Sequence, residues 1–242
     1  MITIKNLSKS YNGHKILDQI DLTISGGNIF ALLGPNGSGK TTILKSILEI
    51  VRPSKNAEII WNGESIVGTN RFKAEVGYMP QLLKFPPHIK VKELITLFEK
   101  LRHKEGLYKN QLIQDLEINL FWNQVFGELS GGMAQKINIL QCFMFDSSLF
   151  ILDEPTSGLD PQVAYYLKQL ICEKKKVGNT ILFTSHVMAE VDAMADEMAL
   201  LVEGKVYTII SPAALKKQKN TTSLEEALNQ FWNTTKNHEK NI

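Results

Sequence analysis

The loop GPNGSGKT at residues 34–41 is the most informative part of the chain. It lies between the apolar run IFALL at 29–33 and the helical pattern TILKSILEI at 42–50. A glycine-rich loop that joins a strand to a helix is the context of a phosphate-binding P-loop. Its backbone N–H groups point inward at phosphate oxygens, and the following helix adds the positive end of its dipole. The loop therefore predicts a nucleotide-binding α/β core.

Side chains of this loop have separate expected roles. Lys40 brings a positive charge to the β- and γ-phosphates, and Thr41 offers its hydroxyl to the Mg²⁺ that the same phosphates hold. We therefore expect a nucleoside triphosphate and Mg²⁺ as cofactors, although a P-loop alone leaves kinase, GTPase and ATPase open. The nucleotide-binding residues predicted from the loop are Gly34, Pro35, Asn36, Gly37, Ser38, Gly39, Lys40, Thr41 and Thr42.

A second informative stretch is LFILDE at 149–154, an apolar strand that ends in two carboxylates. Such a strand end can bring one acid to Mg²⁺ and the next to a water near the γ-phosphate. Asp153 is predicted to bind magnesium and Glu154 to act as the general base. Two adjacent acids could also belong to a plain surface loop, but the P-loop in the same chain favours the catalytic interpretation.

Composition restricts the class of protein. The chain has 242 residues, 43% of them hydrophobic and 21% charged, which is enough for one large core. Its formal net charge of +2 provides no basic field for nucleic acid, so no nucleic-acid partner is expected. The start MITIKNLSKSY does not resemble a secretory signal, and no apolar run approaches the roughly 20 residues of a membrane-spanning helix. We expect a cytoplasmic protein.

Sequence periodicity predicts strands first, then a helical region, then alternating strands and helices. From about 90 to 145 the pattern is helical, and residues 161–177 form another helical stretch. Val91, Leu94, Ile95, Phe98 and Leu101 are expected on one face of the first helix. The strands are expected at 2–7, 16–24, 29–33, 57–61, 75–79, 149–152, 180–185, 198–202 and 205–210. The alternation indicates a parallel α/β core with an inserted helical subdomain.

The C-terminal segment is predicted to be a short amphipathic helix. Ser223 and Glu226 have capping-box spacing, and apolar residues then recur at helical intervals. The helix either docks on its own domain or contacts a partner. The predicted organisation is a nucleotide-binding domain at 1–215, with its helical subdomain at about 82–145, followed by the helix and tail at 216–242.

In the order of its motifs the chain resembles the ATP-binding-cassette (ABC) ATPases, from about residue 2 to residue 210. LSGGM at 129–133 is close to the signature LSGGQ of that family, and SGLD at 157–160 matches the loop after its catalytic acids. His186 follows a strand as the family's switch histidine does, and Gln81 follows VGYMP, where the glutamine loop begins. Tyr11 lies where an aromatic ring stacks on adenine in the family.

This resemblance implies an α/β fold with a RecA-like P-loop NTPase core, an antiparallel β subdomain and the inserted helical subdomain. It implies ATP hydrolysis with Glu154, His186 and Gln81 as catalytic residues, and Gln81 as a further ligand of Mg²⁺. Taken singly, Gln81 and His186 could be ordinary loop residues, and Tyr11 a half-buried ring near a sheet edge.

The signature also has a physical interpretation. Ser130, Gly131 and Gly132 precede a predicted helix, so their hydroxyl and N–H groups form a second phosphate-binding device. Alone, Ser-Gly-Gly is an ordinary turn. In the family this segment completes the nucleotide site of another subunit, which implies a head-to-tail pair, here a homodimer. Met133 departs from the usual Gln, and we expect altered contacts and preserved catalysis.

The resemblance implies a partner of a further kind, a separate transmembrane permease that would hold this chain on the inner face of the cell membrane. The apolar stretch LLKFPPHIKVKEL after Gln81 corresponds to the groove that receives such a partner, with Phe85 as an anchor. The alternative is a soluble ABC ATPase that acts on a protein or a metallocluster scaffold. The run FTSHVMAEVDAMADEMALLVEGKV resembles exporter cassettes, particularly those of nitrous-oxide-reductase copper maturation.

Overall fold

The computed structural model describes residues 1–69 and 71–239, with side chains up to residue 232. Its centre is a six-stranded sheet in the order β10-β9-β3-β8-β7-β6, in which only the edge strand β10 is antiparallel to its neighbour. The strands are β3 (Ile29–Leu33), β6 (Val76–Met79), β7 (Leu149–Asp153), β8 (Thr180–Ser185), β9 (Glu197–Val202) and β10 (Lys205–Ile210).

A second, four-stranded sheet has the order β2-β1-β4-β5, and its strands pair antiparallel. They are β1 (Ile2–Tyr11), β2 (His14–Ile24), β4 (Glu58–Trp61) and β5 (Glu64–Ser65). The predicted first strand ended at residue 7, but β1 continues to Tyr11 through register shifts after Ile4, Leu7 and Lys9. These irregularities interrupt the alternation of apolar residues on which the prediction rested.

Parallel pairing brings the chemically important residues to one edge of the six-stranded sheet. Leu33 lies beside Ser185, and Asp153 lies beside Thr184. Every residue of β3, β7 and β8 is buried, as expected for strands covered on both faces. Since parallel strands end together, the loops after these three strands emerge side by side.

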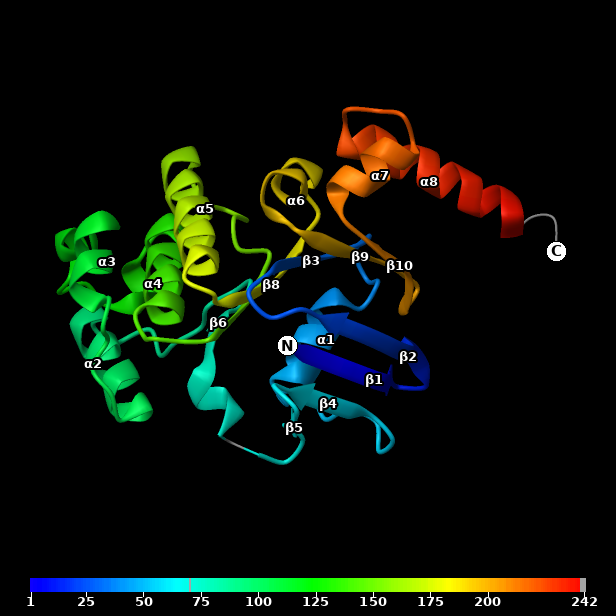
Figure 1. Ribbon diagram of the computed structural model, residues 1–242. Helices are drawn as coiled ribbons and strands as arrows, with labels where there is room; N and C mark the ends of the chain where they lie inside the picture. The colour runs from blue at the N-terminus through cyan, green and yellow to red at the C-terminus, as the bar shows by residue number, and fades with distance from the viewer. Residues whose placement is uncertain (70, 240–242) are drawn as a thin grey trace.

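Helices gather at both ends of this sheet, as Figure 1 shows. Beyond β6 lie α2 (Val91–Arg102), α3 (Lys109–Asp115) and α4 (Gly131–Phe143), together with the short 3-10 turns η2 (Ile118–Phe121) and η3 (Phe126–Glu128). The predicted apolar face of the first helix is buried, except for Leu101 in its last turn, which is 70% exposed. The remaining helical segments are α1 (Lys40–Ile47), η1 (Phe72–Glu75), α5 (Pro161–Lys176), α6 (Met188–Met194), α7 (Pro212–Gln218) and α8 (Leu224–Glu239).

The C-terminal helix α8 docks on its own domain through its first two turns. Leu224, Ala227 and Leu228 are buried in the same core cluster as the helical region. Ser223 accepts the N–H of Glu226, but the Glu226 carboxylate accepts the Thr221 hydroxyl, so only half of the predicted capping box forms. Within the described part of the chain, no helix is long and apolar enough to cross a membrane.

Candidate nucleotide-binding and catalytic site

The P-loop connects β3 to α1, and its glycines are required for different reasons. A Cβ on Gly34 would lie 2.2 Å from the carbonyl oxygen of Leu201, so only glycine fits against β9. Gly39, the N-cap of α1, has φ 103° and would contact Leu17 with any side chain. Gly37 has open space but φ 82°, where glycine carries no steric cost. The fold itself therefore excludes side chains that would also obstruct a phosphate.

Lys40 is held inside this loop. Its Nζ donates to the carbonyl oxygens of Gly34 at 2.7 Å and Pro35 at 3.0 Å, and the residue is 6% exposed. Burial lowers the pKa of the ammonium, while the charges of Glu154 and Asp153 oppose the shift. A partly desolvated cation beside backbone N–H groups is suited to bind a polyphosphate.

Asp153 accepts two hydroxyl hydrogen bonds on one oxygen. Thr41 Oγ1 donates to Asp153 Oδ1 at 3.0 Å, and Thr184 Oγ1 donates to the same atom at 2.7 Å. Asp153 is 2% exposed. A buried carboxylate and a hydroxyl side by side are oxygen ligands of the type that Mg²⁺ prefers. Among the described residues no group of three or more His, Cys, Asp and Glu forms a metal cluster.

Glu154 brings together the three residues predicted to be catalytic. Gln81 Nε2 donates to its Oε2 at 3.0 Å, and Nδ1 of His186 lies 3.3 Å from its Oε1. Its backbone has φ 48°, an uncommon conformation for glutamate, and its N–H donates to Thr184 Oγ1 at 2.9 Å. The carboxylate is thereby fixed from both its backbone and its side-chain partners, as a general base requires.

These side chains surround a cavity of about 550 Å³, within the size range of small-molecule sites. Tyr11 and Ile16 line it on the side of the four-stranded sheet, and Tyr11 is 44% exposed. The other lining residues are Asn36, Gly37, Gly39, Lys40, Thr41, Thr42, Gln81, Glu154 and His186. Ile16 was not predicted, because nothing in its sequence context distinguishes it from a core residue.

Comparison with known proteins agrees with this geometry. The family model described as ABC transporter matches residues 17–157. The chain belongs to the ABC transporter family. It is therefore an ATPase of the ABC type and the ATP-binding component of a transporter.

Individual relatives show the same relationship. The chain is 34% identical to human ATP-binding cassette sub-family A member 13 over 89% of its own length, although it spans only 4% of that protein. It is 31% identical to the Nod factor export ATP-binding protein I of Burkholderia lata, covering 88% of this chain and 72% of that one. A solved structure of the ATP-binding subunit of an ABC transporter is 25% identical, covers 95% of this chain and 98% of its own, and has a TM-score of 0.86.

The ABC signature segment lies apart from the cavity. Ser130 is the N-cap of α4, and its Oγ accepts the N–H of Met133 at 3.2 Å. Ser130 and Gly131 are exposed, and a Cβ on Gly131 or Gly132 would meet nothing within 4 Å. The segment therefore presents N–H groups and a helix N-terminus at the surface, and the chain does not bring it to its own P-loop.

Other predicted residues support the cavity without lining it. Gly34 and Pro35, at the start of the loop, line a neighbouring hollow, and Asp153 is hydrogen-bonded to Thr41, which does line the cavity. Ser38 is 3% exposed, and its Oγ has no hydrogen-bond partner within the described residues. These residues support the ABC site or place a charge near it, but they do not line the cavity.

A polar row on α4 holds the strand that leads to Gln81. Gln135 donates to the carbonyl oxygen of Gln81 at 3.2 Å, and Asn138 donates to that of Pro80 at 2.7 Å. Gln141 donates to the carbonyl oxygen of Tyr78. Sequence reasoning missed this row, although polar residues three apart in an otherwise apolar helix are a recognisable signal. Thr184 was also missed, and a hydroxyl in the apolar strand TILFTS is the corresponding signal.

Proposed function

We propose that this chain is the ATP-hydrolysing subunit of an ABC exporter and acts as a head-to-tail homodimer attached to a separate membrane-spanning permease. One observation supports the proposed dimer. The cavity of about 550 Å³ contains the P-loop and the catalytic carboxylate, while the signature is exposed elsewhere on the chain. A second copy can therefore supply the missing phosphate-binding device to each cavity.

Within each site, different residues of the chain have different roles in binding and hydrolysis. The N–H groups of the P-loop and Lys40 bind the phosphates of ATP, and Tyr11 stacks on its base. Thr41, Asp153 and Gln81 would hold Mg²⁺, which when bound neutralises charge on the phosphates. Glu154 accepts a proton from the attacking water, and Gln81 and His186 keep its carboxylate in place.

Mixing two defective variants tests the composite site. Lys40→Ala weakens the P-loop half, and Gly131→Asp adds a carboxylate to the signature half. The space around Gly131 accommodates the new side chain, so the fold should persist. A mixed dimer then has one site with both lesions and one with neither. We expect ATPase activity to return in proportion to the mixed-dimer fraction.

Each variant mixed with itself is the control, with subunit exchange measured independently by fluorescence energy transfer between labelled chains. Exchange without any recovery of activity would contradict the head-to-tail arrangement, because each chain would then hydrolyse ATP with its own signature. Recovery would support it whatever the permease proves to be.

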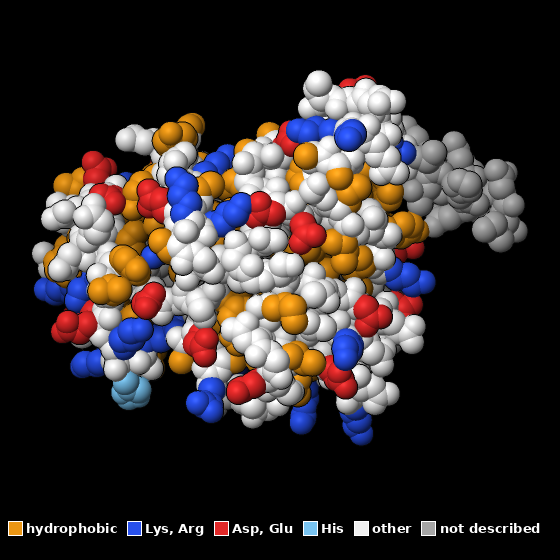
Figure 2. All heavy atoms as spheres, viewed as in Figure 1, with side chains coloured by type: hydrophobic (Ala, Val, Ile, Leu, Met, Phe, Trp, Pro, Cys, Tyr) orange, Lys and Arg blue, Asp and Glu red, His pale blue; other side chains and the backbone are white. Residues whose placement is uncertain are grey.

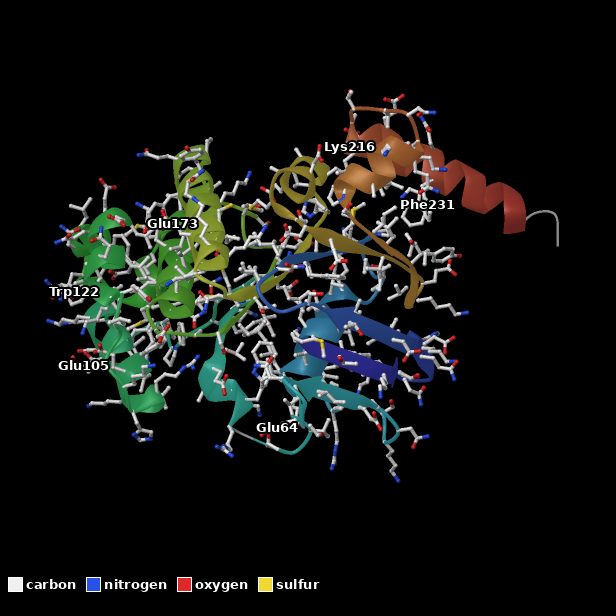
Figure 3. All side chains as sticks on the ribbon, in the orientation of Figure 1. Glu64, Glu105, Trp122, Glu173, Lys216 and Phe231 are labelled. Carbon is white, nitrogen blue, oxygen red and sulfur yellow. The ribbon has the colours of Figure 1, made fainter. Side chains whose placement is uncertain are left out.

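A groove on the helical region is the proposed permease contact. Its volume is about 550 Å³, and α2 forms much of its wall. Trp122, at the outer side of the helices in Figure 3, lines the groove with Ile89 and Leu97. Phe85 was the predicted anchor, but its ring is half-buried, 5.4 Å from both Phe98 and Phe126 between ring centres. Phe85 therefore packs partly within its own domain and does not line this groove, and its role as an anchor stays a prediction.

Two charge substitutions on α2 test this contact. Thr96→Glu places a carboxylate in the groove at an exposed position, where it should not disturb the fold. Leu101→Glu adds the same charge on the same helix outside the groove, at a residue that is 70% exposed. Thr96→Glu should reduce co-purification of the permease in detergent, because a carboxylate would have to be desolvated in the contact. Equal effects of the two variants would argue against the groove.

The direction of transport is supported by the relative from Burkholderia lata, whose name describes Nod factor export. The narrower resemblance to copper-maturation cassettes remains a prediction that rests on residues 183–206. Attachment to the inner face of the membrane follows if a permease binds. Recovery of this chain with a soluble partner in the absence of detergent would instead favour the alternative of a soluble ABC ATPase.

A further inference from the structure

Helix α6 carries a buried carboxylate to which the known motifs assign no role. Glu190 is 5% exposed. Its Oε2 accepts hydrogen bonds from Thr156 Oγ1 at 2.8 Å and from Ser185 Oγ at 3.3 Å. Its Oε1 lies 3.1 Å from Nζ of Lys168 on α5. Both carboxylate oxygens are therefore occupied, and the bonds to the anion are stronger than neutral ones.

The two hydroxyl groups belong to the two segments that carry the catalytic pair. Thr156 is two residues after Glu154, in the loop that leaves β7, and Ser185 is the residue before His186 at the end of β8. Ser185 Oγ also accepts the N–H of Val187 at 2.9 Å, so it shapes the turn that contains His186. One carboxylate thus joins both loops at a point next to the contact between Glu154 and His186.

We infer that Glu190 is a positioning residue for ATP hydrolysis, which sets the distance between the Glu154 carboxylate and the His186 imidazole. Thr184 already joins the ends of β7 and β8, and Glu190 adds a second connection, one that lies beyond the strand ends and within the two loops. Small displacements of a catalytic group reduce the rate of the chemical step and leave binding at the P-loop unaffected. Glu190 is far along the chain from Lys40 and does not line the nucleotide cavity. The inference concerns hydrolysis alone and does not depend on the permease.

Glu190→Gln tests the inference against a matched change on the same helix. The amide keeps the shape of the side chain, but its neutral oxygen accepts the two hydroxyls more weakly than a carboxylate does, and in that orientation its NH2 group faces the Lys168 ammonium, which disfavours the connection. Asp192→Asn is the control, since Asp192 pairs with Lys216 of α7 at 2.6 Å, outside the site; Lys216 is labelled in Figure 3. We expect Glu190→Gln to lower kcat roughly 10- to 100-fold with unchanged ATP affinity. Asp192→Asn should leave both close to those of the parent.

Substitutions at Thr156 separate positioning from a general loss of structure. Thr156→Val is isosteric and removes the hydroxyl, while Thr156→Ser keeps it. Thr156→Val should lower kcat without changing ATP affinity, and Thr156→Ser should restore the rate. The double variant Glu190→Gln/Thr156→Val should be no slower than Glu190→Gln, because both changes break the same connection.

The inference is overturned if Glu190→Gln keeps kcat within about twofold of Asp192→Asn, since removal of the connection would then have no kinetic effect. It is also overturned if Thr156→Val and Thr156→Ser behave alike. A parallel loss of ATP affinity and kcat would point to a structural role and would equally contradict it.

Discussion

The hydroxyl of Thr184 donates to Oδ1 of Asp153 across 2.7 Å, from the neighbouring strand. Oγ1 of Thr184 in turn accepts the backbone N–H of Glu154 at 2.9 Å. Thr184 is fully buried, with 0% exposure. One hydroxyl therefore fixes both the side chain proposed to bind Mg²⁺ and the backbone of the proposed general base.

Thr184→Val removes this hydroxyl with little change of shape. We expect a weaker apparent affinity for Mg²⁺ in ATPase assays at varied Mg²⁺ concentration, together with a lower kcat. The loss of two buried hydrogen bonds should also reduce the free energy of unfolding by roughly 1–3 kcal/mol. Thr184→Ser should preserve the Mg²⁺ dependence, and equal behaviour of the two variants would argue against this role of the hydroxyl.

Glu154→Gln should bind ATP and fail to hydrolyse it. The amide preserves the size of the side chain near the attacking water but cannot accept its proton, so we expect kcat to fall by about 10²–10⁴. ATP affinity, measured by titration, should remain that of the parent, and the variant should accumulate as an ATP-bound dimer. Turnover near the parent rate would contradict the assignment of the general base.

Tyr11→Ala should weaken ATP binding by about 1–3 kcal/mol, because its ring provides a stacking surface at the edge of the cavity. Tyr11→Phe keeps the ring and should retain affinity. Tyr165→Ala serves as a control, since Tyr165 is an exposed tyrosine that does not line the cavity. Loss of affinity in Tyr11→Phe would show that the hydroxyl, and not stacking, is responsible.

Lys174 makes the stability of the protein depend on pH. The residue is 8% exposed, with Nζ 3.3 Å from the ring centre of Tyr108, and burial lowers the pKa of its ammonium below the ordinary 10.5. The unfolded chain therefore binds more protons than the folded one between the two pKa values. The free energy of unfolding consequently gains a contribution as pH rises through this interval.

Lys174→Met removes that contribution. The parent should gain stability relative to Lys174→Met as pH increases toward 10.5. Urea unfolding at several alkaline pH values measures the difference, with the exposed neighbour replaced in Lys176→Met as the control. A difference that does not change with pH would show that burial does not affect this ammonium.

Much of the site was predictable because short motifs specify local backbone chemistry. GPNGSGKT and LFILDE each place their functional side chains at the end of a buried strand. Parallel pairing then brings those ends together without any further information. For this reason Lys40, Thr41 and Glu154 meet around one cavity, with Asp153 directly behind Thr41, as the sequence predicts.

Contacts made by side chains between distant segments were not predictable. Three such residues form hydrogen bonds with segments far from them in the sequence, namely Thr184, Glu190 and Asn138. Their residue types are common in loops and helices, so the sequence does not single them out. The ring contacts of Phe85 could not be predicted for a similar reason, since periodicity does not show which neighbours a half-buried ring meets. Charged side chains of both signs are interspersed on the face shown in Figure 2, in line with the small net charge.

The polar row on α4 has a consequence for a pair of chains. The helix begins at Gly131, directly after its N-cap Ser130, and its side chains donate to the carbonyl oxygens of Tyr78, Pro80 and Gln81. In the proposed dimer, the N-terminal end of α4 would contact the nucleotide bound by the second chain, while the side chains of the same helix position Gln81 in the site of the first chain. A change in nucleotide occupancy at one site could thus shift Gln81 at the other site through α4, without a change in the central sheet.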